Sequence, residues 1–430
     1  MARRHSAAPA APRKTNLVVL LFALAALATG VAPVRAATGV SPADDNTWGT
    51  GIAGTGKAGR VLALAAGNGL VYLGGDFLAV SPPGSADAGA DVARHHLAAF
   101  GNGGTTLADW NPDADDEVHA LLAAPDGKRI YAGGMFHHIG NGPAVRLAAL
   151  DPVTGAVDRT FTPPRPDGVV RALALSPDGK VLYAGGDFDG LILTDGTVVD
   201  RPHIAALDAA TGALTDWLPP KDTGGRYYGH AGTPDRSRPG GVYAIAPSAD
   251  GTTVHVGGSF LSWAGHSGLV SLDAATARPT PWQAKVDRPI WGLDRSRDGH
   301  TFYAAAGGAG GKMYAFRPHG PPGGVWQVKT DGDVMAVLET ATTVYVLGHY
   351  DNIVRPDSSC WQYCPDGMAR EHLSAFDRTG KIEDWNPVAN TPTGPYAAAA
   401  AAGHVYVAGE FTKIGGVRHV GFAAFSGSTR

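Results

Sequence analysis

The chain has 430 residues with a formal net charge of −4, and it contains 60 glycines and 31 prolines. This glycine and proline content, together with little helical periodicity, favours many short strands joined by tight turns. The acidity argues against nucleic acid or an anionic membrane as a partner.

Residues 1–36 are expected to form a secretory signal peptide. Basic residues precede an apolar run over residues 17–31, and a small-x-small cleavage site ends at Ala36. Arg3 and Arg4 lie too far from the apolar run for a twin-arginine signal, so we expect the general secretory route. Removal of the segment deletes five basic and no acidic residues, which changes the net charge from −4 to −9. No other stretch is apolar enough to span a membrane, so the mature protein is expected to be extracellular.

The remaining residues, 37–430, repeat one strand pattern seven times. Four copies are close to one another: VYLGGDF at 71–77, IYAGGMF at 130–136, LYAGGDF at 182–188 and VHVGGSF at 254–260. Three copies have diverged: FYAAA at 302–306, VYVLGHY at 344–350 and VYVAGEF at 405–411. Self-similarity at a period of roughly 40 to 70 residues, with only strand-type segments, indicates a β-propeller or a related array.

Each repeat predicts one four-stranded blade, and the third repeat shows the pattern most clearly. Its strands A, B, C and D are expected at residues 170–175, 181–188, 204–207 and 214–218. An Asp-Gly pair joins strands A and B, as it does in three other repeats, and this pair is typical of a two-residue hairpin turn. We therefore interpret these aspartates as turn formers and not as ligands.

An aromatic residue marks strand D of every repeat and predicts a core position between blades: Trp48, Trp110, Phe161, Trp217, Trp282, Trp326 and Trp385. Trp48 precedes the first strand A, whereas the last repeat ends at Phe425 after strand C. We therefore expect residues 46–49 to complete the last blade and close the ring, which hides the strand edges that an open array exposes. The predicted fold is an all-β, seven-bladed β-propeller over residues 37–430.

A second motif follows the first in the same repeats. It reads LAALD at 147–151 followed by Thr154-Gly155, and IAALD at 204–208 followed by Thr211-Gly212. With the two motifs together, the chain resembles secreted bacterial β-propeller proteins of the delta-60 repeat type, over essentially the whole mature length. The resemblance implies an architecture, and it brings neither an established reaction nor catalytic residues.

Loop length distinguishes the two faces of the predicted propeller. The A–B and C–D turns on one face are short, whereas the B–C and D–A connections on the other include residues 78–92, 189–202, 219–241 and 351–370. Because insertions in repeat architectures gather on the binding face, we expect function on the B–C and D–A side. Drift in exposed loops is the alternative interpretation.

Comparison of the repeats identifies a variable position beside one that is kept small. The variable position, second in strand A, reads Leu62, His119, Arg171, Tyr243, Trp291, Met335 and Tyr396. Its expected neighbours across the A–B hairpin are Asp76, Met135, Asp187, Ser259, Gly307, His349 and Glu410. We expect an ion pair between Arg171 and Asp187, and packing of Trp291 on Gly307. Three acids among these neighbours indicate a channel mouth in contact with water; packing between blades is the alternative.

Aromatic residues in the long connections extend this candidate site and are expected to be exposed. They suit a ligand with apolar faces and polar edges, such as a glycan or an extended peptide, although they could instead pack within their own loops. The predicted ligand-binding residues are Arg171, Tyr243, Trp291, Tyr396, Asp76, Trp263, Trp361 and Tyr227.

The sequence contains no pattern that predicts a cofactor. A G-x-G-x-x-G pattern at residues 54–59 opens no helix, which argues against dinucleotide binding. The acidic residues of segment 113–117 could bind calcium or form a solvated loop, and no other metal site is expected. Cys360 and Cys364 are the only cysteines, and in an exported protein they predict a disulfide more readily than a thiolate metal site.

These patterns favour a secreted, monomeric protein that binds an extracellular or cell-envelope carbohydrate or peptide on its loop-rich face. The alternative is a hydrolase or lyase acting on a polysaccharide through acids and histidines at the channel mouth. Its candidate general acids and bases are Asp187, Glu410, His119 and His349. A purely structural assembly component is a third possibility.

Overall fold

The protein is all-β, as predicted. The computed structural model describes residues 47–52, 57–83, 90–221, 226–228, 233–235, 240–282, 284–308, 310–318, 324–355, 358–360, 364, 366–391 and 393–426. In these ranges the regular structure is antiparallel strand with short 3₁₀ turns, and no α-helix occurs. The predicted signal segment, residues 1–36, lies outside the described residues.

Seven units of three antiparallel strands each are found within the described residues. Unit 1 contains β3 (Val61–Gly67), β4 (Leu70–Gly75) and β7 (Leu97–Gly101); unit 2 contains β8 (Val118–Ala123), β9 (Ile130–Gly134) and β12 (Leu147–Leu150); and unit 3 contains β14 (Val170–Leu175), β15 (Val181–Gly186) and β18 (Ile204–Asp208). Unit 4 contains β21 (Val242–Pro247), β22 (Thr253–Gly258) and β23 (Leu269–Asp273), and unit 5 contains β24 (Ile290–Arg295), β25 (Phe302–Ala306) and β26 (Lys312–Phe316). Unit 6 contains β28 (Asp333–Glu339), β29 (Thr343–His349) and β32 (Leu373–Asp377), and unit 7 contains β33 (Pro395–Ala401), β34 (His404–Gly409) and β37 (Phe422–Ser426).

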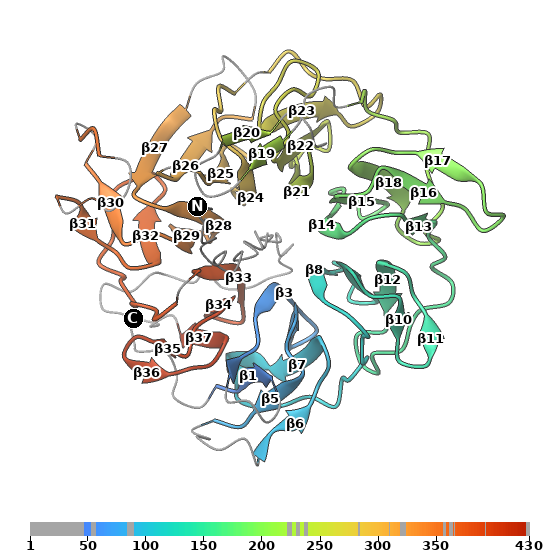
Figure 1. The fold of residues 1–430 in the computed structure, drawn as a ribbon, viewed down its shortest axis with the longest axis horizontal. Helices are drawn as coiled ribbons and strands as arrows, with labels where there is room; N and C mark the ends of the chain where they lie inside the picture. The colour runs from blue at the N-terminus through green and yellow to red at the C-terminus, as the bar shows by residue number, and fades with distance from the viewer. Residues whose placement is uncertain are drawn as a thin grey trace, which may run out of the picture.

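The first strands of the units are neighbours in chain order. β3 contacts β8, β8 contacts β14, and the series continues through β21, β24 and β28 to β33. β33 in turn contacts β3, so the first and last units lie side by side. Figure 1 shows the units around a common centre with these first strands innermost.

A complete fourth strand occurs only in unit 5 of the described chain, as β27 (Gly324–Thr330). In units 1, 2, 3, 4 and 6 the expected strand D is reduced to a single bridge, such as that between Phe100 and Leu107. The prediction of a full strand D in each repeat is therefore wrong. Prolines explain most of the difference, because proline cannot donate a backbone hydrogen bond to a sheet. A proline stands two positions after the aromatic marker in four of these units, as Pro112, Pro163, Pro219 and Pro387.

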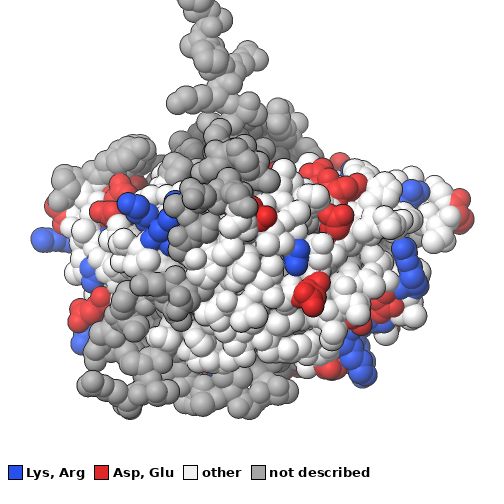
Figure 2. Space-filling view, turned by 90° about the horizontal axis from the view of Figure 1, so that it is seen from below, with Lys and Arg blue, Asp and Glu red and all other residues white. Residues whose placement is uncertain are grey.

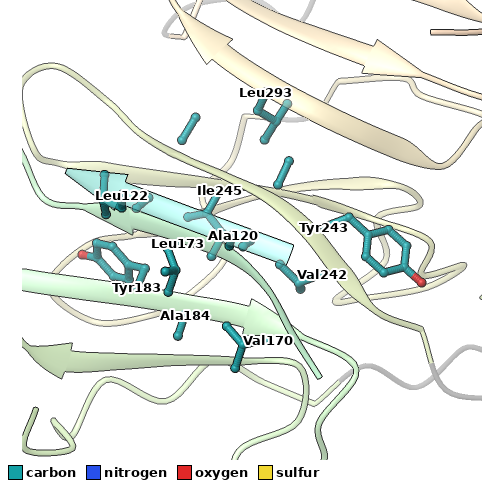
Figure 3. Packing of buried hydrophobic residues seen from close by; sticks show 14 of the residues in the cluster. Ala120, Leu122, Val170, Leu173, Tyr183, Ala184, Val242, Tyr243, Ile245 and Leu293 are labelled. Atoms are coloured by element: carbon teal, nitrogen blue, oxygen red, sulfur yellow. The ribbon is translucent and has the colours of Figure 1, made fainter. Parts of the chain in front are cut away.

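The paired glycines of the second strands fix how closely the chain packs. A Cβ on Gly185 would lie 2.4 Å from Cγ1 of Val242 in the next unit, so the first glycine admits a branched side chain from the neighbour. A Cβ on Gly186 would lie 1.9 Å from the carbonyl oxygen of Val169 on its own first strand. Figure 3 shows Val242 and Ile245, which pack on Gly185, together with Val170 and Leu173 of the same hydrophobic core.

Aromatic residues at the predicted marker positions join neighbouring units. The Trp110 ring meets the Tyr72 ring of its own unit edge-on at 5.0 Å, and Nε1 donates to the Asp151 carbonyl oxygen of the next unit at 2.9 Å. Trp217 repeats this arrangement with Tyr183 and with the Asp273 carbonyl oxygen. These positions are therefore inter-unit contacts, as the sequence predicted.

The N-terminal segment bridges the first and last units. Thr50 N donates to the Val420 carbonyl oxygen at 2.7 Å, and the Thr47 hydroxyl lies 2.6 Å from Nδ1 of His419. On the other side, Trp48 N donates to the Gly104 carbonyl oxygen at 3.0 Å. Residues 46–49 were expected to form the fourth strand of the last unit, but β1 (Gly49–Ile52) pairs with β5 (Ala79–Ser81) and β2 (Lys57–Ala58), and no strand pairing of β1 with β37 is found in the described residues.

Substitution of Trp48 tests whether this bridge stabilises the fold. Trp48→Ala removes the ring that stacks on Phe100 and should lower the free energy of unfolding by about 2–3 kcal/mol, below the full cost of a buried tryptophan because Trp48 is half-buried. Trp48→Phe keeps the ring contact and should cost about 1 kcal/mol. Urea unfolding measures both, with the 73% exposed Val153→Ala as control. An unchanged stability in Trp48→Ala would contradict the bridge.

Cys360 and Cys364 form the predicted disulfide, with their Cα atoms 5.7 Å apart. The bridged loop is tied to the body of unit 5 and to the segment after β27, because Cys364 N donates to Oδ2 of Asp331 at 3.1 Å and Lys329 Nζ donates to the Cys360 carbonyl oxygen. Of the intervening residues, 361–363 lie outside the described residues, and with them the predicted site residue Trp361.

Removal of the disulfide should have a small and local effect. Replacement of both cysteines by serine should cost no more than about 2 kcal/mol, because closure of so short a loop removes little entropy from the unfolded chain. Hydrogen exchange should increase in residues 351–370 and stay unchanged in units 1 to 4. Exchange that increases throughout the molecule would show that the bridge stabilises the whole fold.

Candidate functional site

All seven first strands carry a β-bulge at the same place. The pairing register between the first and second strands skips one residue in every unit. The skipped residues are the predicted variable position, and we call them the bulge ring: Leu62, His119, Arg171, Tyr243, Trp291, Met335 and Tyr396. A bulged residue leaves the regular pairing and its side chain is re-aimed, so this position varies without disturbing the sheet.

The bulge changes the expected partners across the hairpin. In unit 1, Val61 and Ala63 pair with Gly75 and Gly74, so Leu62 has no partner directly opposite. Asp76 is instead bound by Arg60, whose Nε lies 2.5 Å from Oδ2. The predicted ion pair between Arg171 and Asp187 is confirmed, with Nε 2.7 Å from Oδ2.

Units 1 to 3 contribute a chain of charged groups to the site. Arg60 reaches across to unit 2, where Nη2 donates to Oε1 of Glu117 at 3.0 Å. Oε2 of Glu117 lies 3.1 Å from Nε2 of His119. The hydrogen bond from His119 holds the pKa of Glu117 below its usual value, with a further contribution from Arg60. Burial lowers the pKa of His119, which keeps its imidazole neutral at physiological pH.

Units 4, 5 and 7 contribute aromatic residues. Tyr243 packs against Trp291 with ring centroids 5.4 Å apart, and its hydroxyl lies 2.9 Å from the Ser259 hydroxyl. Arg171 lies over the Tyr243 ring at 5.9 Å, which joins the charged half of the site to the aromatic half. In unit 7, the Tyr396 hydroxyl lies near Thr393 and 3.5 Å from Oε2 of Glu410.

Trp291 covers Gly307, as predicted. A Cβ on Gly307 would lie 1.7 Å from Nε1 of Trp291, so the glycine is required for the ring to lie flat there. Nε1 of Trp291 and Nδ1 of His119 are buried without a hydrogen-bond partner among the described residues. Buried polar atoms of this kind are costly unless a partner satisfies them, so these two mark where a ligand would gain hydrogen bonds.

The acidic side chains of the site are more exposed to solvent than its aromatic side chains. Trp291, Tyr243 and Tyr396 are at most 5% exposed, whereas the side chains of Asp187 and Asp76 are 25% and 19% exposed. Ligand contact in the present conformation would therefore begin at the charged pairs. The half-buried His349 lies opposite the His372 ring, with ring centroids 6.2 Å apart. In unit 6 it occupies the position that Asp187 and Asp76 hold in their own units.

Two further predicted residues lie outside the bulge ring. Trp263 was expected to be an exposed loop residue, but it is 1% exposed, because its ring packs edge-on against Phe260 and Nε1 donates to the Pro220 carbonyl oxygen. The expectation of an exposed aromatic there is wrong. Tyr227 lies in β19 (Arg226–Tyr228), and its side chain is outside the described part of the structure.

The acidic segment proposed for calcium has other partners. Oδ1 of Asp113 lies 2.6 Å from Nδ1 of His95, and Oδ1 of Asp115 accepts hydrogen bonds from the backbone of His137 and His138. Asp331 accepts equivalent backbone bonds from Asp351 and Asn352, so in both places the aspartate binds the loop that follows a second strand. In the part of the chain that the structure describes, no group of three potential metal ligands is found.

Sequence comparison missed Arg60 and Glu117, although a signal was present. Both residues directly precede the first strand of their units, at the position occupied by Val169 in unit 3 and Gly241 in unit 4. An aligned column at this position would have shown three charged residues, Arg60, Glu117 and Asp333, among neutral ones.

At the opposite ends of the first strands, the aspartates of the Asp-Gly turns form local hydrogen bonds. Oδ1 of Asp178 accepts from the Ser176 hydroxyl and from Lys180 N, and Asp250 does the same with Ser248 and Thr252 N. The aspartates of the Asp-Gly turns are therefore turn formers, as predicted.

One pair of buried acids on this side was not predicted. Asp294 accepts hydrogen bonds from Arg295 N at 2.8 Å and from Glu339 N at 2.6 Å, and both acids are 4% exposed. Burial raises the pKa of Asp294 to about 6 and that of Glu339 to about 7, and the Asp294 charge raises the pKa of Glu339 further.

No helix of the described residues is both long enough and apolar enough to cross a membrane. Comparison with models of known protein families finds no match, and no curated protein matches the chain. The site is therefore interpreted from its own geometry.

The buried acid pair predicts a specific pH dependence of stability. Acids with a raised pKa bind protons in the folded state that the unfolded chain releases above about pH 4, so their contribution falls as the pH rises through about 7. Glu339→Gln removes one titrating group, and its free energy of unfolding should fall less steeply between pH 5 and 8 than that of the parent. Urea unfolding at four pH values measures the slope. The exposed Glu371→Gln is the control, and parallel curves for Glu339→Gln and the parent would refute the assignment.

Proposed function

We propose that this protein is a secreted, seven-bladed β-propeller that binds an extracellular or cell-envelope carbohydrate or peptide at the bulge ring. The closed order of contacts from β3 to β33 and back supports the ring architecture. The contacts of Thr47 and Thr50 with the last unit support closure by the N-terminal segment. The resemblance of the two repeat motifs to delta-60 repeat proteins is consistent with both.

The proposal that the protein is exported is supported by the sequence of residues 1–36 and by the two cysteines. A basic segment, an apolar run and a small-x-small site stand in the order of a secretory signal. The disulfide between Cys360 and Cys364 is a bond that persists in an oxidising compartment. Figure 2 shows positive and negative side chains interspersed on the visible side, without the basic patch typical of a nucleic-acid-binding surface.

The observation that carries the binding proposal is the variation of the bulge ring on a constant scaffold. The seven equivalent positions hold six different residue types, and they bring guanidinium, imidazole, indole and phenol groups to one end of the first strands. The partly exposed pair of Arg171 and Asp187 offers donors and acceptors side by side. Sugar hydroxyls and peptide amides both match such a surface, because each also donates and accepts.

An enzyme acting on a polysaccharide is a second candidate, supported by the contact of Glu117 with the neutral His119. In this case the candidate acids and bases are His119, Asp187, His349 and Glu410. Glu117 would act as a positioning residue, because it holds Nε2 of His119 and leaves Nδ1 open.

Substitution of Arg171 tests the placement of the site. Arg171→Gln leaves Asp187 without its partner and removes the cation above Tyr243, so ligand affinity should fall about tenfold or more. Glycan and peptide arrays, followed by calorimetry on each hit, measure the loss. Arg129→Gln is the matched control, because Arg129 forms a pair of similar burial with Asp158 at 2.7 Å on the Asp-Gly turn side. Equal losses in both variants would refute the placement.

The double variant Asp187→Asn with Glu410→Gln separates the two candidate functions. If the protein is an enzyme, turnover of its polysaccharide should disappear while the polysaccharide still binds. If it is a binding protein, purified protein should release no reducing ends or unsaturated products from a broad polysaccharide panel, and the double variant should change affinity alone.

A further inference from the structure

A groove on the outer side of the molecule is separate from the bulge ring. It is lined by residues 198–202, 218–221 and 276–279 and has a volume of about 820 Å³. The first range includes β17 (Val198–Asp200), the second follows Trp217 in unit 3, and the third is the turn after β23 in unit 4. Figure 1 shows β17 at the outer edge of the ring, away from the first strands.

One wall of the groove is the edge of a small sheet. The sheet has the order β13 (Arg165–Pro166), β16 (Gly190–Ile192) and β17, so in the described structure β17 pairs on one side only. Leu193 N donates to the Thr197 carbonyl oxygen, and Arg201 N donates to that of Asp189. In an antiparallel ladder the bonded residues alternate, so Val198 and Asp200 direct their backbone groups away from β16. This edge can accept a further strand.

The groove combines exposed aliphatic side chains with excess positive charge. Val198 and Leu218 are 64% and 51% exposed, and they are two of the few large hydrophobic residues exposed in the described structure. Three basic residues line the groove against one acid, Asp200, which is paired with Lys221. Arg278 is exposed and forms no ion pair with a described residue, and Nε of Arg201 is buried without a hydrogen-bond partner there.

We propose that this groove binds an extended acidic peptide segment of a partner protein, which adds a strand to the free edge of β17. The outward backbone groups of Val198 and Asp200 would pair with the peptide backbone, and its alternate acidic side chains would meet Arg201 and Arg278. A peptide fits better than a glycan, because the described residues that line the groove include no aromatic side chain to stack on sugar rings. The inference does not depend on the ligand of the bulge ring.

Fluorescence anisotropy with a labelled peptide tests the proposal on the full-length mature protein. The probe is Glu-Val-Glu-Thr-Glu-Val-Glu, and the same peptide with lysine in place of glutamate should not bind. Val198→Pro removes the outward N–H while leaving the bonds to β16, and proline is tolerated at such an edge. Arg278→Glu reverses an exposed charge in the opposite wall. Each variant should weaken binding of the acidic peptide about tenfold or more.

The control is Lys128→Glu, which reverses an equally exposed charge on the turn after β8, at 80% side-chain exposure, and it should bind like the parent. Arg278→Glu leaves β17 unaltered. If Val198→Pro fails to fold, binding of the acidic peptide to Arg278→Glu therefore still tests the proposal. The proposal is overturned if the acidic peptide does not bind, or if Lys128→Glu weakens binding as much as Arg278→Glu does. It is also overturned if oligogalacturonate binds in its place and Val198→Pro has no effect.

Discussion

The close approach permitted by the paired glycines is the constraint on which the packing of units 1 to 4 depends. The first glycine of the pair admits a branched side chain from the next unit, as Gly185 does for Val242. The second lies against a carbonyl oxygen of the preceding strand, as Gly186 does for Val169. In units 1 to 4 both places are held by glycine, so the same two residues set the distance between units and the geometry of the hairpin there, whereas Ala305, Leu347 and Ala408 occupy the first place in units 5, 6 and 7.

The bulge adjoins the second contact, and this links packing to function. The register of the hairpin breaks two residues after the Val169 carbonyl that faces Gly186, at Arg171. The side chain of that residue takes no part in the regular ladder, so its identity is free to change without loss of pairing. A repeat architecture thereby gains a position that can differ in every unit. An opposite charge next to that position, as Asp187 supplies for Arg171, compensates the half-buried charged group.

Much of the fold could be predicted from the sequence because the seven repeats can be aligned with one another. The hairpins, the Asp-Gly turns, the aromatic markers and the ion pair of Arg171 with Asp187 all follow from comparing one repeat with another. The bulge could not be read in this way, because a skip in register leaves no mark in the residue pattern of a strand.

Other features depend on contacts between segments that are distant in sequence. The burial of Trp263 depends on the Pro220 carbonyl oxygen, 43 residues away. The raised pKa values of Asp294 and Glu339 arise from their burial where β24 and β28 of two different units meet, with the Asp294 charge as a second cause for Glu339. The shortened fourth strands were predictable, since the prolines that follow the aromatic markers were visible in the sequence.

The most direct test of the account is photo-crosslinking with a ligand identified on a glycan or peptide array and carrying a diazirine. Mass spectrometry of the labelled protein would locate the modified residues. The account predicts labels in the segments that contain Arg171 and Asp187 and in those around Tyr243 and Glu410. Labels confined to the Asp-Gly turns at the opposite ends of the first strands would contradict it.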